Sequence, residues 1–263
     1  MTALRRVTPQ LLTLAALVAL ITLFFPDFLR IEVINGRLVG TTMDILKRGA
    51  PIGLLAVGMT LVIATRGIDL SVGTTMAITG AIAAWSITQG YGLGGALALA
   101  LLAGVAAGLW NGLLVAIFGI QPIVATLILM TSGRGIAQLV TEGRILTFSH
   151  DGMAFFGSGD LMGIPAPALL WLLTAAGVAL LMRRSALGML IEAVGVNRAA
   201  SALAGVNATV LLIAVYVASG LCAALAGIVA TADIRGADAN NAGLWLELDA
   251  ILAVVIGGNS LMG

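Results

Sequence analysis

Apolar residues follow one another in long runs along this chain, and polar positions gather in the short segments between the runs. About eight runs reach or approach the roughly 20 residues that a helix needs to cross a bilayer. They are 8–25, 50–65, 70–88, 94–118, 122–141, 165–182, 209–231 and 247–263. Because the runs are continuous rather than alternating, and lipid tolerates no unpaired backbone groups, the pattern predicts helices.

The predicted fold class is therefore all-α, a polytopic transmembrane helix bundle with residues 1–263 as a single domain. Cations near the ends of the runs predict its orientation, because cytoplasmic ends carry an excess of lysine and arginine. The cations that precede the first run and follow the sixth indicate a cytoplasmic N-terminus: Arg5, Arg6, Arg183, Arg184 and Arg198. Residues 26–49 are then expected to form an external loop, although they contain Lys47 and Arg48.

Composition agrees with a membrane protein and excludes other classes. Hydrophobic residues make up 60% of the chain and charged residues 10%, against about a quarter charged in soluble domains. The net charge of +1 is too small for the basic surface that nucleic-acid binding requires. The single cysteine, Cys222, excludes an intrachain disulfide and is expected to be a small buried hydrophobe. The first run has no small-residue cleavage site after it, so we expect an uncleaved first span.

The run 94–118 contains small residues at every fourth position, which places them on one face of a helix. They are Ala96, Ala100, Gly104, Gly108 and Gly112. Small side chains let a neighbouring membrane helix approach closely, so this face predicts helix packing. Asn111 lies near the same face, and its amide must bond to another helix or line a polar cavity. The sequence leaves both explanations open.

Arg66 and Asp69 are the only charged residues in the stretch 50–88. An aspartate at membrane depth costs about 2.5–3.5 kcal/mol on insertion scales, so such a residue usually faces a bundle interior or a wet cavity. In one explanation, residues 65–70 form a turn in which Arg66 reaches the cytoplasmic surface and Asp69 caps the next helix. In another, Asp69 lies deep in the bundle beside a polar pathway.

A third explanation combines the first two. Gly67 and Gly73 flank Asp69 and Ser71, and this spacing allows a broken, re-entrant segment whose freed backbone groups line a pathway. The stretch 257–263 repeats the same order of apolar run, glycine, polar residue and glycine. Glycine-interrupted segments at corresponding places in two halves of a chain point to the pathway of a transporter. The predicted fold therefore includes helices broken at glycine-rich segments.

The sequence contains no constellation typical of an enzyme. Ser149, His150 and Asp151 are the residue types of a hydrolase triad, but adjacent residues cannot converge in triad geometry. His150 is the only histidine, which excludes a clustered-histidine metal site. No GxxxxGK[ST] sequence occurs, so any ATP must be hydrolysed by another chain. Arg134, within the run 122–141, needs a carboxylate, carbonyl groups or the interface nearby, with Asp69 and Asp249 as candidate carboxylates.

Several motifs in order resemble the membrane permease subunit of bacterial ribose/galactose-type ABC sugar importers, with the galactofuranose-type branch as the nearest. The motifs are "GMTLVIATRGIDLSVGTTMAITGAIAA", "GLWNGLLVA", "GIQPIVATLILMTSGRGIAQLVTEG", "EAVGVNRAASALAGVN" and "AILAVVIGGNSLMG". The resemblance implies a multi-pass subunit of the bacterial inner membrane that forms the path in a homo- or heterodimer. It also implies a periplasmic sugar-binding protein and a cytoplasmic ABC ATPase that binds ATP and Mg, with no cofactor on this chain.

The sequence departs from the family at two places. Arg66 stands where the family more often has a small residue such as glycine. Family members continue past the motif that ends at Gly263 with additional helices, so we expect this chain to lack the C-terminal helices of the family.

The predicted orientation places the loop 183–208 in the cytoplasm, and the resemblance suggests a role for it. Asn197 is placed to cap a short helix and Gly205 to end it, although the helix between them is too short and apolar to stand alone in water. A hairpin lying against the bilayer explains the residues alone. The resemblance implies a cytoplasmic coupling helix that docks on the ATPase. The expected coupling residues are then Glu192, Gly195, Asn197 and Arg198.

The predicted function is the permease subunit of an ATP-driven monosaccharide importer. The expected residues of the translocation path are Asp69, Ser71, Asn111, Gln121 and Thr126. The alternative is an ion-coupled secondary transporter, in which Asp69, Arg134 and Asp249 form a charge relay. An intramembrane hydrolase is a third class, and it would need a buried nucleophile with a base in reach.

Overall fold

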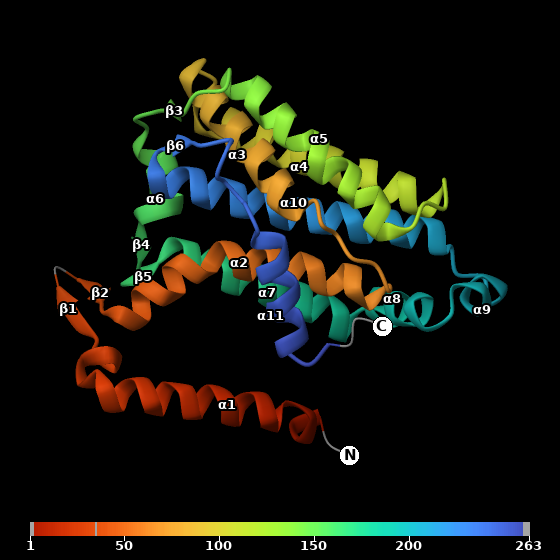
Figure 1. Ribbon diagram of the computed structural model, residues 1–263, viewed down its shortest axis with the longest axis horizontal. Helices are drawn as coiled ribbons and strands as arrows, with labels where there is room; N and C mark the ends of the chain where they lie inside the picture. Colours follow the sequence, from red (N-terminus) through yellow and green to blue (C-terminus); the bar gives the residue numbers. More distant parts are fainter. Residues whose placement is uncertain (1–2, 35, 260–263) are drawn as a thin grey trace.

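The computed structural model describes residues 3–34 and 36–259, and it is built almost entirely from helices (Figure 1). The longer helices are α1 (Ala3–Phe24), α2 (Thr41–Ala64), α3 (Val72–Thr88), α4 (Gly92–Ala116), α5 (Pro122–Thr141), α7 (Ala166–Arg184) and α10 (Ala208–Ile234). The shorter helices are η1 (Pro26–Leu29), α6 (Asp151–Ser158), α8 (Ala186–Val196), α9 (Arg198–Leu203) and α11 (Leu246–Ile256). The all-α prediction is confirmed in this part of the chain.

Helix α10 forms the centre of the bundle, where it packs against α4, α2 and α3. Helix α3 lies between α4 and α5, and α2 packs against α7 and α11. Helix α1 lies apart from the others and joins them through η1 (Figure 1). The buried apolar clusters therefore centre on α10 and on the two helices, α2 and α3, that the break at 65–71 joins.

The small-residue face of α4 packs directly on α10, as the sequence predicts. A methyl group added at Gly104 would meet the Gly220 carbonyl and Ala224. One added at Gly108 would meet the backbone of Tyr216. Because lipid supplies no hydrophobic force between helices, this close backbone approach is what holds the two together.

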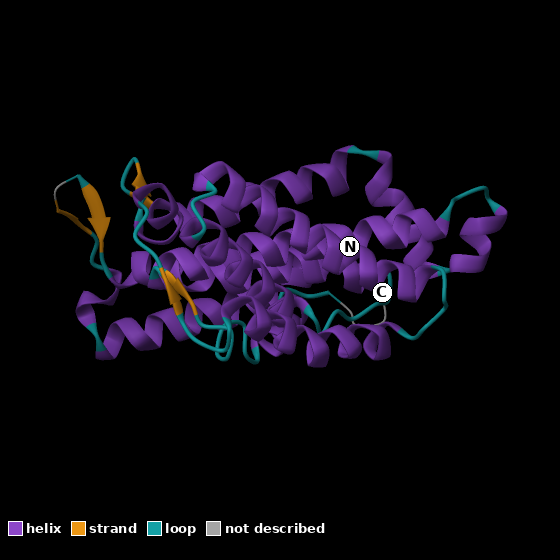
Figure 2. Cartoon of the chain, turned by 90° about the horizontal axis from the view of Figure 1, so that it is seen from above, coloured by secondary structure: helices purple, strands orange, loops and turns teal. Residues whose placement is uncertain are grey.

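The two ends of the bundle differ in structure. Short antiparallel strand pairs gather at one end, here called the hairpin end, as Figure 2 shows. The pairs are β1 (Glu32–Ile34) with β2 (Arg37–Val39), β3 (Leu146–Thr147) with β6 (Gly236–Ala237), and β4 (Asp160–Leu161) with β5 (Ile164–Pro165). Helices α8 and α9 lie at the opposite end, and the N-terminal end of α1 points the same way (Figure 1).

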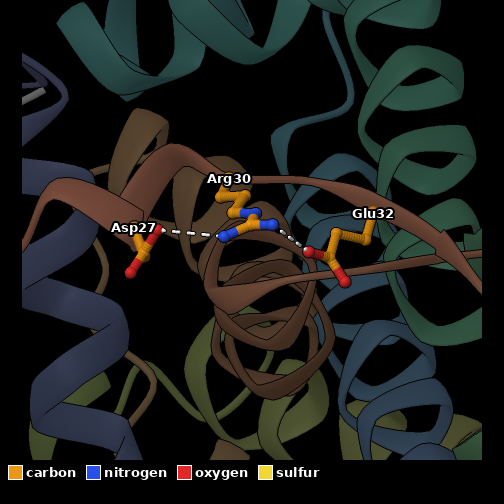
Figure 3. Close-up of polar contacts among 3 residues, drawn as sticks. All are labelled: Asp27, Arg30 and Glu32. Atoms are coloured by element: carbon orange, nitrogen blue, oxygen red, sulfur yellow. Dashed lines mark hydrogen bonds and ion pairs between the residues drawn. The ribbon is translucent and has the colours of Figure 1, made fainter.

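The prediction that 26–49 forms a loop is wrong for its second half, because α2 already begins at Thr41. Lys47 therefore lies on a helix, and its Nζ pairs with Asp233 Oδ1 of α10 at 2.7 Å. In the first half, Arg30 pairs with Asp27 at 3.4 Å and with Glu32 at 2.8 Å (Figure 3). These exposed pairs link the turn after η1 to β1 and add little stability.

Five helices are long and apolar enough to cross a membrane by length and composition, in the part of the chain that the structure describes: α2, α4, α5, α7 and α10. They match the predicted spans 50–65, 94–118, 122–141, 165–182 and 209–231. The other predicted ranges correspond to shorter apolar helices, at Thr8–Phe24, at α3 and at α11. The range 247–263 was predicted too long, because α11 ends at Ile256 before Gly257. Residues 260–263, with part of the 257–263 motif, lie outside the described residues.

Candidate functional site

The segment between α2 and α3 is a true break that runs from the α8–α9 end of the bundle into its interior. Helix α2 ends at Ala64, and α3 begins only at Val72, deep among α4, α5 and α10. Arg66 has a left-handed backbone with a φ of 60°, and the Gly67 N–H donates back to the Val62 carbonyl at 3.0 Å. Gly67 has no room for a side chain, because a methyl group there would lie 2.8 Å from Tyr216 Oη. The prediction of a glycine-dependent interruption at this point is confirmed.

Asp69 is buried within this break and accepts three hydrogen bonds. Its Oδ1 accepts from the Ser71 N–H at 3.0 Å and from Ser71 Oγ at 2.6 Å. Its Oδ2 accepts from Ser219 Oγ of α10 at 2.9 Å. The carboxylate therefore ties the start of α3 to the central helix, while Arg66 is exposed. The exposure of Arg66 is what the turn explanation expects, but Asp69 does not cap α3: it bonds to Ser71, which precedes the helix, and to Ser219.

Two further helices join the same group of side chains. Asn111 of α4 donates from Nδ2 to Ser71 Oγ at 2.7 Å. Thr126 of α5 accepts from the Leu70 N–H at 3.1 Å and bonds to the Ile68 carbonyl at 3.3 Å. We call Asp69, Ser71, Asn111, Thr126 and Ser219 the Asp69 network; all five are buried.

The network includes four of the five residues predicted for the path and adds one that the sequence missed. Ser219 is one of several hydroxyl residues in the apolar run of α10, so no signal in the sequence set it apart. Gln121 is the exception, because it is exposed and lies outside the network. Two buried side-chain atoms lack a hydrogen-bond partner among the described residues: Oδ1 of Asn111, within the network, and Oη of Tyr216, outside it.

A cavity of about 590 Å³ lies at the α8–α9 end of the bundle, next to the break. It is lined by Thr65, Arg66, Gly67, Val115, Gly119, Ile120, Gln121, Pro122, Val194, Gly195, Val196, Asn197, Arg198, Ala199, Leu212 and Tyr216. Gln121 therefore belongs with the predicted coupling residues rather than with the network. Tyr216 lines this cavity and also contacts Gly67, so it connects the cavity to the break.

Residues 183–208 form two helices that rest on the ends of the bundle helices. A methyl group added at Gly195 would meet the Ala64 carbonyl, so α8 touches the last turn of α2. Arg198 donates from Nη2 to the Ala116 carbonyl at the end of α4, at 3.0 Å. A cation at that position also complements the negative end of the helix dipole.

The short helix predicted between Asn197 and Gly205 is present as α9. Asn197 Oδ1 accepts from the Ala200 N–H at 3.0 Å, which is the expected cap, and Gly205 follows with a φ of 86°. Helix α8 was not predicted, because Ser185 and Val196 bound an apolar stretch that reads as a continuation of α7. Glu192 lies exposed on α8.

Arg134 of α5 does not bond to either carboxylate that the sequence suggested. Its Nη1 donates to the carbonyls of Ala239 and Ala242, at 3.1 Å and 2.5 Å. The acidic groups whose charge acts on Arg134 are Glu247 and Asp238. Asp69 bonds instead to Ser71 and Ser219, so the relay of Asp69, Arg134 and Asp249 is not formed.

The segment that Arg134 holds runs from β6 to α11 and is built around Asp238. This carboxylate accepts from the Asn240 and Asn241 N–H groups and from Asn241 Nδ2, at 3.0, 3.2 and 2.7 Å. These three hydrogen bonds close the turn at Asp238. Within residues 3–34 and 36–259, no cluster of histidine, cysteine or acidic side chains is suited to hold a metal ion.

These features define a class of protein. The chain is a multi-pass membrane protein in which a broken helix is locked by buried polar groups. A structured segment at one end contacts the helices that flank the break.

Comparison with known proteins assigns the chain to a family. The family described as branched-chain amino acid transport system / permease component matches residues 41–263, and the chain belongs to it. The galactofuranose transporter permease protein YtfT of Escherichia coli is 58% identical over 255 residues, which are 97% of this chain and 75% of that protein. The fructose import permease protein FruF of Bifidobacterium longum is 42% identical over 94% of this chain and 71% of that protein. The ribose import permease protein RbsC of Escherichia coli is 37% identical over 97% and 78%. No solved structure matches the chain.

Proposed function

We propose that this protein is the permease subunit of an ATP-driven importer of a monosaccharide. It receives the sugar from a periplasmic binding protein and forms the translocation path with a second permease subunit. ATP and Mg bind to a cytoplasmic ATPase partner, and this chain has no ATPase site of its own. The chain lies in the bacterial inner membrane as one transmembrane domain, with the N-terminus and residues 183–208 in the cytoplasm. The sugar importers among its relatives support the substrate class.

One observation carries this proposal above the others. Segment 183–208 contacts the ends of two helices, α2 through Gly195 and α4 through Arg198. Helix α2 leads directly into the break, and α4 carries Asn111 of the Asp69 network. A partner that moves α8 and α9 would therefore move α2 and α4 with them, and these two helices lead to the break and carry Asn111.

Two polar atoms at the break are candidates for new hydrogen bonds when the helices move. The network holds four helices together through short side chains, while Tyr216 Oη and Asn111 Oδ1 have no partner within the described residues. A buried polar atom without a partner costs about 1–3 kcal/mol, so a rearrangement that gives either atom a partner would offset part of the cost of moving the helices. A second arrangement that satisfies them is what an ATP-driven cycle would use.

The partner ATPase gives the direct test of the proposal. We expect an ATP-hydrolysing subunit to co-purify when the chain is expressed with its genetic neighbours and extracted in mild detergent. Glu192→Arg reverses a charge on the exposed face of α8 and is expected to reduce the amount of ATPase retained severalfold. Glu142→Arg makes the same change at the hairpin end and is the control.

Loss with Glu192→Arg and retention with Glu142→Arg would support docking on α8. Equal retention in both variants would show that the ATPase does not dock there. A complex that transports sugar with no ATPase would overturn the proposed function itself.

A further inference from the structure

The chain contains a second interruption, which also leads from one end of the bundle into its interior. After β6 the chain runs from the hairpin end to α11, which begins in the middle of the molecule (Figure 1). Arg134 of α5 donates to the Ala239 and Ala242 carbonyls, and Gly243 packs against the backbone of Gly73 at the start of α3. We call residues 238–245 the return segment.

The central part of α5 marks the depth of the return segment. Thr74, next to Gly73, donates to the Met130 carbonyl at 3.0 Å. Met130 lies near the middle of the helix Pro122–Thr141, which is long and apolar enough to span the bilayer. The return segment therefore places irregular backbone beside the middle of a membrane span.

The two interruptions differ in the exposure of their polar side chains. The Asp69 network is buried, and its side chains bond mainly to one another. The return segment instead has exposed amide side chains at Asn240 and Asn241. Irregular backbone at membrane depth occurs only where it is covered by protein or faces water, because hydrocarbon cannot satisfy its polar groups. Asn240 bonds to Gln138, one turn before α5 ends at Thr141, so the exposed amides lie toward the hairpin end, while Gly243 lies level with the middle of α5. A segment that begins with exposed amides at the hairpin end and leads irregular backbone inward is suited to contact with water rather than with lipid.

A pair of amides joins this segment to α5. Gln138 Nε2 donates to Asn240 Oδ1 at 2.7 Å. That bond leaves the Gln138 carbonyl oxygen and the Asn240 amino group for other partners. Together they are an acceptor and a donor held side by side, and a sugar hydroxyl both donates and accepts.

Trp245 adds an apolar surface at the end of the same segment. Its φ is 65°, a left-handed conformation that is an outlier for a bulky residue, and its side chain is 62% exposed. Backbone strain of this kind collects at functional sites. Tryptophan at the membrane–water boundary is common, but Trp245 starts a helix in the middle of the bundle. An exposed indole there offers a flat apolar face and one N–H donor.

We propose that the return segment forms the water-facing wall of the translocation path, where Trp245, Asn240 and Gln138 contact the passing saccharide. Arg134 is a positioning residue, because it holds the segment through two carbonyls and does not touch the sugar. This inference rests on the proposed sugar-import function and assigns the sugar contact to residues outside the Asp69 network. The Asp69 network then closes the protein behind the path and does not bind the substrate.

Thiol labelling tests whether the segment faces water. Cys222→Ala removes the chain's single cysteine, and Asn240→Cys or Leu102→Cys is then added. Leu102 is a matched exposed position on α4, with 62% of its side chain accessible. In membranes that contain the complete transporter, we expect a water-soluble maleimide to label Asn240→Cys at least about tenfold faster, because only a hydrated thiol ionises. Equal rates would overturn the water-facing wall.

Uptake measurements test the sugar contact. Radiolabelled galactose and ribose serve as probes in vesicles with the ATPase and the binding protein. Trp245→Ala is expected to lower uptake at low sugar concentration at least about tenfold, and Trp245→Phe to restore most of it. Trp110→Ala, another exposed tryptophan, is expected to change uptake less than about twofold.

The outcomes separate this inference from the proposed function. Uptake by Trp245→Ala equal to that of Trp110→Ala, with an intact complex, would overturn the sugar contact and leave the importer standing. No ATP-dependent uptake of either probe by the unaltered protein would count against the proposed function and its sugar contact, while the labelling rates would still decide the water-facing wall.

Discussion

Removing one hydroxyl from the Asp69 network is expected to destabilise the protein more than removing a similar hydroxyl elsewhere. In Ser219→Ala, Asp69 Oδ2 loses the bond of 2.9 Å that Ser219 Oγ donates. Such a bond is worth about 2 kcal/mol, because the variant leaves a buried carboxyl oxygen without its partner. For a chain of this size that loss corresponds to roughly 4–8 °C in Tm. Thermal unfolding of the purified protein in detergent measures the shift.

Ser86→Ala is the matched control for this prediction. Ser86 is also buried on a membrane helix, but its Oγ donates to the Ile82 carbonyl of its own helix at 2.7 Å. Such a bond adds little to helix stability, so we expect a shift below about 2 °C. If the two variants unfold at the same temperature, the bond from Ser219 to Asp69 does not stabilise the network as described.

Three further variants test the contacts of the segment 183–208 and of α4. Gly195→Ala forces a methyl group onto the end of α2 and is expected to reduce sugar uptake per ATP hydrolysed at least about threefold, with Gly177→Ala in open space on α7 as control. Asn197→Ala removes the cap of α9 at a cost of about 1 kcal/mol, which faster amide hydrogen exchange in α9 would reveal. Gly108→Ala separates α4 from α10 and is expected to cost about 1–3 kcal/mol in thermal unfolding, while Gly94→Ala on the same helix meets no atom and leaves stability unchanged or higher. Equal behaviour of a variant and its control would contradict the packing described.

Hydrophobic runs predicted the bundle because lipid imposes a simple requirement on each helix. A long apolar run at 122–141 became α5 with the same ends, since Pro122 starts the helix and Gly143 follows it. The same rule failed at the start of α2, where Lys47 and Asp44 interrupt the run but remain helical. Lys47 is tolerated there because Asp233 of another helix neutralises it. Partners that lie far away along the chain are invisible to a run of apolar residues.

At the site, too, the features set by neighbouring residues were predicted, and the contacts between distant helices were not. The spacing of Gly67, Asp69 and Ser71 predicted a break and a local hydrogen bond, and both are present. Ser219 was missed because only the packing of α10 brings its hydroxyl to the carboxylate. Gln121 directly precedes α5, whose residue Thr126 reaches the network, whereas Gln121 lines the cavity; the sequence could not separate the two positions because the cavity is formed only by the packing at the α8–α9 end.

The claim that this protein belongs to an ATP-driven importer is tested most directly by measuring which energy source drives uptake. The chain, its ATPase partner and the binding protein would be reconstituted in vesicles, and uptake of radiolabelled sugar would be followed. We expect accumulation that requires ATP on the α8–α9 side and persists when proton and sodium gradients are collapsed. Accumulation that follows an ion gradient without ATP would contradict the account, because it would make the protein an ion-coupled transporter.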